Sequence, residues 1–316
     1  MSFQTQIDLQ TQSHHHIDYA SKVLLLGSCF AENIADKFSY FKFQQLQNPF
    51  GILFHVSGIE TLLTNAINGE QYDEKDIFFH NEQWHCFDAH SKLSNPSKEQ
   101  LLTSLNDNLM STRQYLETAS HVIITLGTAW VYRFIETDTH VANCHKIPQK
   151  KFLKELMLVD ELRNALQAIV SLIKSVNSKT SILFTVSPVR HIKDGFVENN
   201  RSKAHLLTAI HDIVEPRENV HYFPSYEIMM DELRDYRFYE SDMLHPNSTA
   251  ISHIWEKFQK VWISKDSAKT MLEVDTVQKG MLHRPFNSKS EAHQQFLQKL
   301  EVKKEQLQSL FPNILF

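Results

Sequence analysis

Two short segments carry side chains that together could cleave an ester. In "VLLLGSCFA" an apolar run ends at Gly27 and Ser28, and in "SDMLHPN" Asp242 lies three residues before His245. A serine hydroxyl becomes a nucleophile when a base, itself oriented by a third group, lies within hydrogen-bond reach. We therefore assign Ser28 as candidate nucleophile, His245 as candidate base and Asp242 as the carboxylate that orients it.

The pattern of apolar runs predicts the elements that must bring these segments together. Strands are expected at residues 22–27, 121–127, 180–188 and 219–225, with a weaker one at 41–47. Amphipathic helical patterns separate them, which is typical of a doubly wound, three-layer α/β domain with a mostly parallel sheet. Ligands bind such sheets at the carboxyl ends of the strands.

Each segment alone is more often structural, because serine is a common helix N-cap and an Asp-x-x-His pair is common on surfaces. Ser28 follows the first predicted strand, however, and His245 precedes the last predicted helix of the domain. The candidate nucleophile and the candidate base are thus expected at the same edge of one sheet, which favours a catalytic role for both.

The predicted domain covers residues 1–264, with two polar and aromatic insertions, 70–96 and 129–152, at the carboxyl edge of the sheet. Residues 265–316 read as a helical extension packed on the domain, which offers a surface for a homo-oligomer.

Composition narrows the class of protein. The chain has 316 residues, a net charge of −5 and no block of basic residues, so nucleic acid is not an expected partner. No apolar run reaches the roughly 20 residues of a membrane span, and the N-terminus lacks a secretory pattern. The three cysteines are few and far apart in sequence, which fits a reducing compartment. We expect a cytoplasmic protein without a cofactor or a membrane partner.

Several motifs resemble the GSCFA family, a set of bacterial proteins that is similar to the SGNH (GDSL-like) hydrolases. They are "LLLGSCFAENIADKF", "NPFGILFH", "ITLGTAWVYR" and "SPVRHIKDGFVENNRSKAHL". The resemblance implies a flavodoxin-like three-layer α/β/α sandwich and a serine esterase or acyl-hydrolase mechanism. Ser28, His245 and Asp242 match the catalytic triad, and the backbone N–H groups of Ser28 and Gly51 match the oxyanion hole.

The sequence departs from the SGNH pattern at the third strand. Ala129 stands about where an asparagine side chain would donate to the oxyanion. Loss of one such donor typically costs about a hundredfold or more in rate. Asn143 and Asn48 are candidate replacements, and we prefer Asn143 because it lies in an insertion near the sheet edge. A purely structural turn role for Asn143 has similar weight.

Other side chains are expected to line the substrate pocket: Asn48, Thr128, Trp130, Arg190 and His191. Aromatic rings such as Trp84, Trp130 and Tyr132 offer flat surfaces for a sugar or acyl group. Arg190 follows a strand directly and could hold a carboxylate or phosphate, or equally form a structural salt bridge.

Cysteine and histidine suggest two further interpretations. Cys29, at a helix N-terminus, is a rival nucleophile to Ser28, although a small buried apolar role is favoured. The residues His85, Cys86 and His90, with Cys144 and His145, could form a zinc site, but no paired C-x-x-C accompanies them. We therefore predict no metal.

The leading hypothesis is a serine hydrolase of an acyl ester, acetylesterase-like, acting on a small molecule or a carbohydrate. Whether water or another hydroxyl accepts the acyl group stays open. The alternative is a weak or inactive hydrolase fold that binds a carbohydrate or small metabolite, because its oxyanion hole is incomplete at Ala129.

Overall fold

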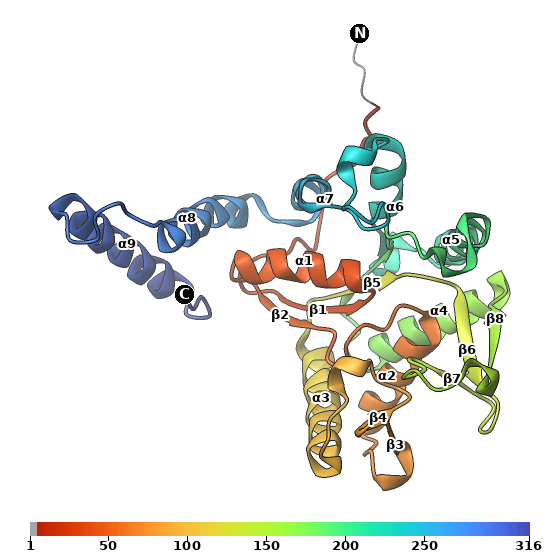
Figure 1. Ribbon diagram of the computed structural model, residues 1–316. Coiled ribbons are helices and arrows are strands. Elements are labelled where there is room, and N and C mark those ends of the chain that lie inside the picture. Colours follow the sequence, from red (N-terminus) through yellow and green to blue (C-terminus); the bar gives the residue numbers. More distant parts are fainter. Residues whose placement is uncertain (1–4) are drawn as a thin grey trace.

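A five-stranded parallel sheet forms the centre of the computed structural model, which describes residues 5–316 (Figure 1). Its strands are β1 (Lys22–Gly27), β2 (Gln44–Gln47), β5 (His121–Leu126), β9 (Ser181–Val186) and β10 (Val220–Tyr222). They lie in the order β10-β9-β5-β1-β2, and every neighbouring pair is parallel. The predicted strands and the α/β class are confirmed.

The winding of the chain reverses between β1 and β5. From β1 the chain passes through α1 (Cys29–Tyr40) to β2, and from β2 it crosses back to β5 on the other side of β1. In sheets of this order, ligands bind where the order reverses, in the crevice at the carboxyl ends of the two strands. Ser28 directly follows β1, and Gly127 directly follows β5. The predicted nucleophile therefore lies at the switch point of the sheet.

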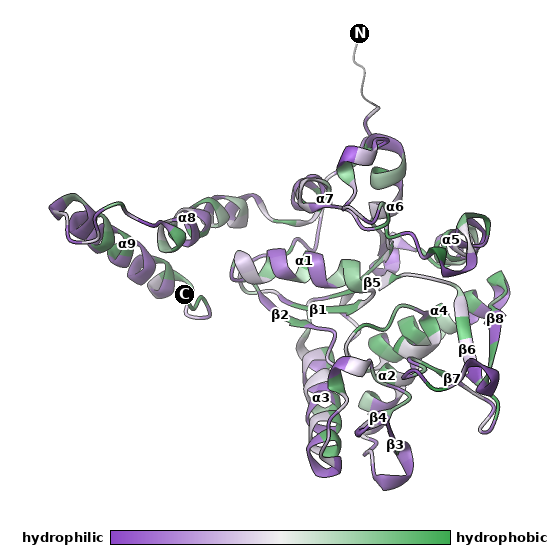
Figure 2. Ribbon diagram, in the orientation of Figure 1, coloured by the Kyte–Doolittle hydropathy of each residue, from purple (hydrophilic) through white to green (hydrophobic). Residues whose placement is uncertain are grey.

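Two apolar cores, one on each face of the sheet, explain why the central strands are almost continuously apolar. Leu24 and Leu26 belong to one core, whereas Val23 and Leu25 belong to the other. The first core takes side chains from α2 (Val56–Asn68), α3 (Lys98–Thr118), α4 (Val159–Val176) and α5 (Phe196–His211). The second takes them from α1, α7 (Ser248–Trp262), α8 (Lys265–Leu282) and α9 (Glu291–Leu310). Figure 2 shows hydrophobic residues along β1, whereas α8 and α9 are largely hydrophilic.

The two insertions form small antiparallel sheets of their own. The first contains the hairpin of β3 (Ile77–His80) and β4 (Gln83–Cys86), and the second contains β6 (Trp130–Phe134) and β7 (Thr139–Val141), joined by β8 (Phe152–Leu156). Ala142 N donates to Phe87 O at 2.8 Å, and His90 N donates to Phe50 O at 2.9 Å. The insertions thus contact each other and the loop that follows β2.

The segment after α7 is helical, as predicted, and its end returns to the domain. After α8 and α9, the ring of Phe311 lies 5.0 Å from that of Tyr19, and Asn313 Nδ2 donates to Tyr19 O at 3.1 Å.

A short helix, α6 (Ser225–Glu227), follows β10. Within residues 5–316, no helix combines the length and the apolar character needed to cross a membrane.

Candidate active site

Ser28 occupies the tip of β1 because the preceding residue is a glycine. Gly27 has φ +131°, and a Cβ added there would lie 2.1 Å from Thr125 O. Ser28 is then the N-cap of α1, and its Oγ accepts a hydrogen bond from Phe30 N at 3.3 Å. The residue is 0 % exposed. The hydroxyl is at the predicted place in the fold, but it is buried and used as a cap.

Asp242 and His245 form the pair that their spacing predicts. Asp242 Oδ2 accepts from His245 Nδ1 at 2.6 Å, while Oδ1 accepts from the backbone N–H of Leu244 at 2.8 Å and of His245 at 3.0 Å. These backbone bonds and the imidazole lower the pKa of Asp242 to about 2. The carboxylate is therefore ionised at neutral pH, and it holds the imidazole in the tautomer that leaves Nε2 as the basic nitrogen.

The loop that carries this pair is fastened to the end of β9. Arg190 N donates to Leu244 O at 3.2 Å, so the segment after β9 contacts the Asp-x-x-His loop directly. The side chains of Asp242 and His245 remain about half exposed, at 45 % and 46 %. Among the residues that the structure describes, no hydrogen bond joins Ser28 to His245. The structure thus brings two members of the predicted triad together, and their meeting with Ser28 stays a prediction.

Both backbone donors of the predicted oxyanion hole already have acceptors. Ser28 N donates to Thr125 O at 3.0 Å, which extends the ladder between β1 and β5. Gly51 N donates to Asn48 O at 2.7 Å, which closes the turn after β2. An oxyanion would have to displace these bonds, so the hole expected from the sequence is not assembled in this structure.

Asn143 shows the structural role that the sequence left open. Its Oδ1 accepts from His145 N at 2.8 Å and from Ser91 Oγ at 3.3 Å, so the side chain closes a turn inside the second insertion. The preference for Asn143 as the replacement donor therefore has no support from the contacts of this side chain.

Asn48 is the better placed of the two asparagines. Its N–H donates to Leu25 O at 2.9 Å, and its Oδ1 accepts from Gly27 N at 2.8 Å, so the side chain continues the strand ladder in place of a backbone carbonyl. Asn48 is buried, and in the described part of the chain Nδ2 has no hydrogen-bond partner. Buried amide donors are rarely left unpaired. One amide group beside the Gly27–Ser28 junction is thus available to an acceptor.

A buried lysine that the sequence analysis missed lies at the same edge. Lys203, in α5, is 1 % exposed, and its Nζ donates to Gly127 O and to Ser187 O, both at 2.7 Å. These carbonyls follow β5 and β9. Burial lowers the pKa of Lys203 to about 7. In the sequence Lys203 looks like an ordinary lysine on the surface of a helix. The one signal of its burial is that it lies four residues after Asn199, which places both side chains on the same face of α5.

Neighbouring residues of α5 fasten the loop after β9. Asn199 Oδ1 accepts from His191 N at 2.9 Å, and Asn200 Oδ1 accepts from Arg190 Nη1 at 2.8 Å. His191 itself is largely buried, and a Cβ on Gly127 would lie 3.0 Å from its Nε2. Burial and the charge of Lys203 lower the pKa of His191 to about 3, so the imidazole is neutral. Arg190 and His191 therefore lie at the edge predicted for them.

The depressed pKa of Lys203 makes a prediction about stability. In the unfolded chain a lysine titrates near pH 10.4, so between about pH 7 and pH 10 the unfolded state binds one proton more than the folded state. The free energy of unfolding should therefore rise with pH in this window, by at most about 1.4 kcal/mol per pH unit. Urea titrations of the wild type and of Lys203→Met across this window measure the difference; parallel pH profiles would contradict the depressed pKa.

Thr128 and Trp130 have structural partners instead of open faces. Thr128 Oγ1 lies 3.0 Å from Ser202 Oγ and accepts from Trp130 N at 3.0 Å. The ammonium of Lys154 lies 4.9 Å from the centre of a Trp130 ring. These contacts support loop positioning for both residues, and they cover part of the surface expected to stack on a substrate.

The cysteine and histidine residues show no metal site. His85 Nε2 is 2.9 Å from His80 O, and His145 Nε2 is 2.7 Å from Cys86 O, so these imidazoles bind backbone carbonyls. No group of three potential ligands occurs within residues 5–316. Burial, more than any other cause, raises the pKa of Cys29, which packs against the second core. This environment fits the small apolar role for Cys29.

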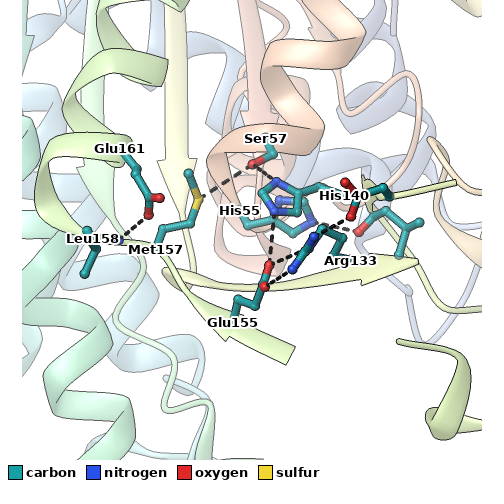
Figure 3. Close-up of polar contacts among 10 residues, drawn as sticks. His55, Ser57, Arg133, His140, Glu155, Met157, Leu158 and Glu161 are labelled. Carbon is teal, nitrogen blue, oxygen red and sulfur yellow. Dashed lines mark hydrogen bonds and ion pairs between the residues drawn. The ribbon is translucent and has the colours of Figure 1, made fainter. Parts of the chain in front are cut away.

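A second serine and histidine meet between α2 and the sheet of β6, β7 and β8 (Figure 3). Ser57 Oγ is 3.1 Å from His140 Nδ1, whereas His140 Nε2 is 3.7 Å from Glu155, beyond hydrogen-bond distance. Arg133 donates to both oxygens of that carboxylate. Because both oxygens of Glu155 are already engaged by Arg133, this group is better suited to fastening the insertion than to activating Ser57.

Comparison with known proteins places these residues in a family. The model described as GSCFA domain protein, C-terminal domain, matches residues 274–316, and comparison with the curated proteins finds no match. The model of the GSCFA family matches residues 22–258, which include Ser28 and the Asp242–His245 pair. The boundary predicted after residue 264 falls between the two matches. Since the first match alone spans most of the chain, the protein belongs to the GSCFA family.

Proposed function

We propose that this protein is a serine hydrolase of acyl esters, acetylesterase-like, in which Ser28 attacks, His245 moves the proton and Asp242 orients His245. The observation that carries the proposal is the location of Ser28, held by Gly27 at the reversal of strand order where sheets of this topology bind ligands. The Asp242–His245 pair, fastened to the loop after β9, supplies an oriented base at the same edge. The resemblance to SGNH hydrolases supports the same roles.

The chemistry requires a rearrangement at the switch point. The hydrogen bond from Phe30 N to the Ser28 hydroxyl must break, and the half-exposed loop that carries His245 must close over Ser28. Ser28 Oγ then bonds to the acyl carbon while its proton passes to His245 Nε2, and the imidazolium returns that proton to the departing alkoxide. Water or a second hydroxyl removes the acyl group in the next step.

The negative charge on the carbonyl oxygen needs a fixed donor. We assign this role to Asn48 Nδ2, the buried amide group with no partner in the described chain. Its carboxamide is oriented by Gly27 N, next to the nucleophile. This assignment would compensate for Ala129, where SGNH hydrolases have an asparagine.

One observation favours a second candidate function. Ser28 is fully buried, its Oγ is a helix cap, and the N–H groups of Ser28 and Gly51 are both bonded within the protein. A protein that keeps this arrangement would bind a small metabolite or carbohydrate without turning it over.

An active-serine probe separates the two. A fluorophosphonate should label the wild type, and Ser28→Ala should abolish the labelling, because only an activated serine reacts with it. Ser57→Ala is the matched control, since Ser57 also contacts a histidine but lacks an available carboxylate; it should label like the wild type.

Labelling that persists in Ser28→Ala, or that is lost in Ser57→Ala, would overturn the assignment of Ser28. A wild type that does not react, but is stabilised against heat by a metabolite, supports the binding function.

A further inference from the structure

A cavity of about 790 Å³ lies beside the Asp-x-x-His loop. Asp242, Met243 and Leu244 form one of its walls, and Arg190, in the loop after β9, forms another. Any molecule in this cavity therefore contacts the loop that carries the proposed base. A cavity next to the reacting groups is where the part of a substrate that determines specificity is expected.

Arg190 is a cation without a carboxylate partner among residues 5–316. Its Nη1 donates to Asn200 Oδ1, and its Nη2 contacts Met230 Sδ, both at 2.8 Å. A guanidinium has five N–H donors and pairs best with carboxylate or phosphate. Arg190 instead has a neutral amide and a thioether, which position it and leave its charge uncompensated.

The other charged groups in the wall already have polar partners. Arg234 pairs with Asp231 at 3.2 Å, and Asp235 pairs with Arg237 at 3.6 Å. The carboxylate of Asp242 accepts three hydrogen bonds from its own loop. Asp242 keeps its negative charge, but its oxygens are occupied by these three bonds. Arg190 is therefore the cation in this wall whose remaining N–H donors have no anionic partner among the described residues.

The remaining lining is apolar and aromatic. Phe196, Tyr236 and Met243 are exposed there, and Met229 and Leu233 are buried beneath. Exposed large apolar side chains around a fixed cation fit a ligand whose hydrocarbon part ends in an anion.

We propose that this cavity binds an ionised oxygen group of the substrate, a carboxylate or a phosphate, with Arg190 as its anchor. This rests on the proposed function and specifies its substrate class, an ester that carries a negative charge on its acyl or its alcohol part. Arg190 acts here as a binding residue, and Asn200 positions it.

Matched esters test the proposal. 4-Nitrophenyl hemisuccinate is compared with neutral 4-nitrophenyl butyrate, and 3-acetoxybenzoate with neutral phenyl acetate. In Arg190→Met, kcat/KM for at least one anionic ester should fall about 10- to 100-fold relative to its neutral partner, the size of a lost charge-assisted hydrogen bond. Arg234→Met, in the same wall but paired with Asp231, should leave both ratios within about twofold.

Unchanged ratios in Arg190→Met, with esters still cleaved, would overturn the anchor and leave the hydrolase standing. If no ester is cleaved, the proposed function fails separately, and calorimetric titration decides the anchor. Succinate or inorganic phosphate should then bind the wild type but not Arg190→Met, and succinamide should bind neither. Binding of succinate alone identifies a carboxylate site, and binding of phosphate alone a phosphate site. Absence of binding to the wild type, or binding that Arg190→Met retains, overturns the proposal.

Discussion

Replacing Gly27 with alanine should destabilise the protein by about 4 kcal/mol or more, enough to unfold a typical domain at physiological temperature. The new Cβ would lie 2.1 Å from Thr125 O and 2.8 Å from Thr125 C, which are backbone atoms of the neighbouring strand. Because β1 and β5 are paired on both sides of this point, neither backbone can retreat without breaking the sheet. The positive φ of Gly27 adds strain to the clash. Urea unfolding followed by circular dichroism measures the effect.

Gly195→Ala is the matched control for this prediction. Gly195 also has a positive φ, +92°, but a Cβ there would meet nothing within 4 Å. Gly195→Ala should therefore lower the free energy of unfolding only by the backbone strain, about 1 to 3 kcal/mol. Equal losses in the two variants would show that φ, and not the close approach of β5, makes Gly27 necessary.

The elements around the candidate site could be predicted because their signals are local. The apolar run before Gly27 and the capping serine after it mark the end of β1 and the start of α1 within a few residues. The Asp242–His245 contact is likewise a matter of three residues of spacing in one loop. Such features require no knowledge of distant segments.

Contacts between distant segments could not be predicted in the same way. Lys203 binds the carbonyl of Gly127, 76 residues earlier in the chain, and its burial depends on how α5 packs against two strand ends. Asn48 reaches Gly27 only because β2 pairs with β1 in one register. The sequence favours Asn143 over Asn48, because residue type alone does not distinguish an asparagine that closes a turn from one beside a nucleophile. Register and packing decide between them.

Asp242→Asn should lower the rate of ester hydrolysis about 10⁴-fold while leaving the fold intact, through the tautomer of His245. Oδ1 accepts from the N–H groups of Leu244 and His245, which can only donate, so the asparagine oxygen must stay there. The new NH₂ group then faces His245 Nδ1, where Oδ2 stood. Nδ1 becomes an acceptor, and the proton moves to Nε2, which can no longer take one from Ser28.

Asp235→Asn supplies the comparison, because Asp235 also accepts from a backbone N–H and also lines the cavity beside the loop. It should keep activity within about twofold of the wild type. Circular dichroism and melting temperature establish that both variants fold. If Asp242→Asn retains more than about a tenth of the wild-type kcat, the carboxylate does not set the tautomer, and His245 is not the base. A full loss of activity in Asp242→Asn, with an unchanged melting temperature, instead shows that the Asp-x-x-His loop takes part in the chemistry. This loop is fastened to the segment after β9, whereas Ser28 lies at the end of β1, two strands away in the sheet.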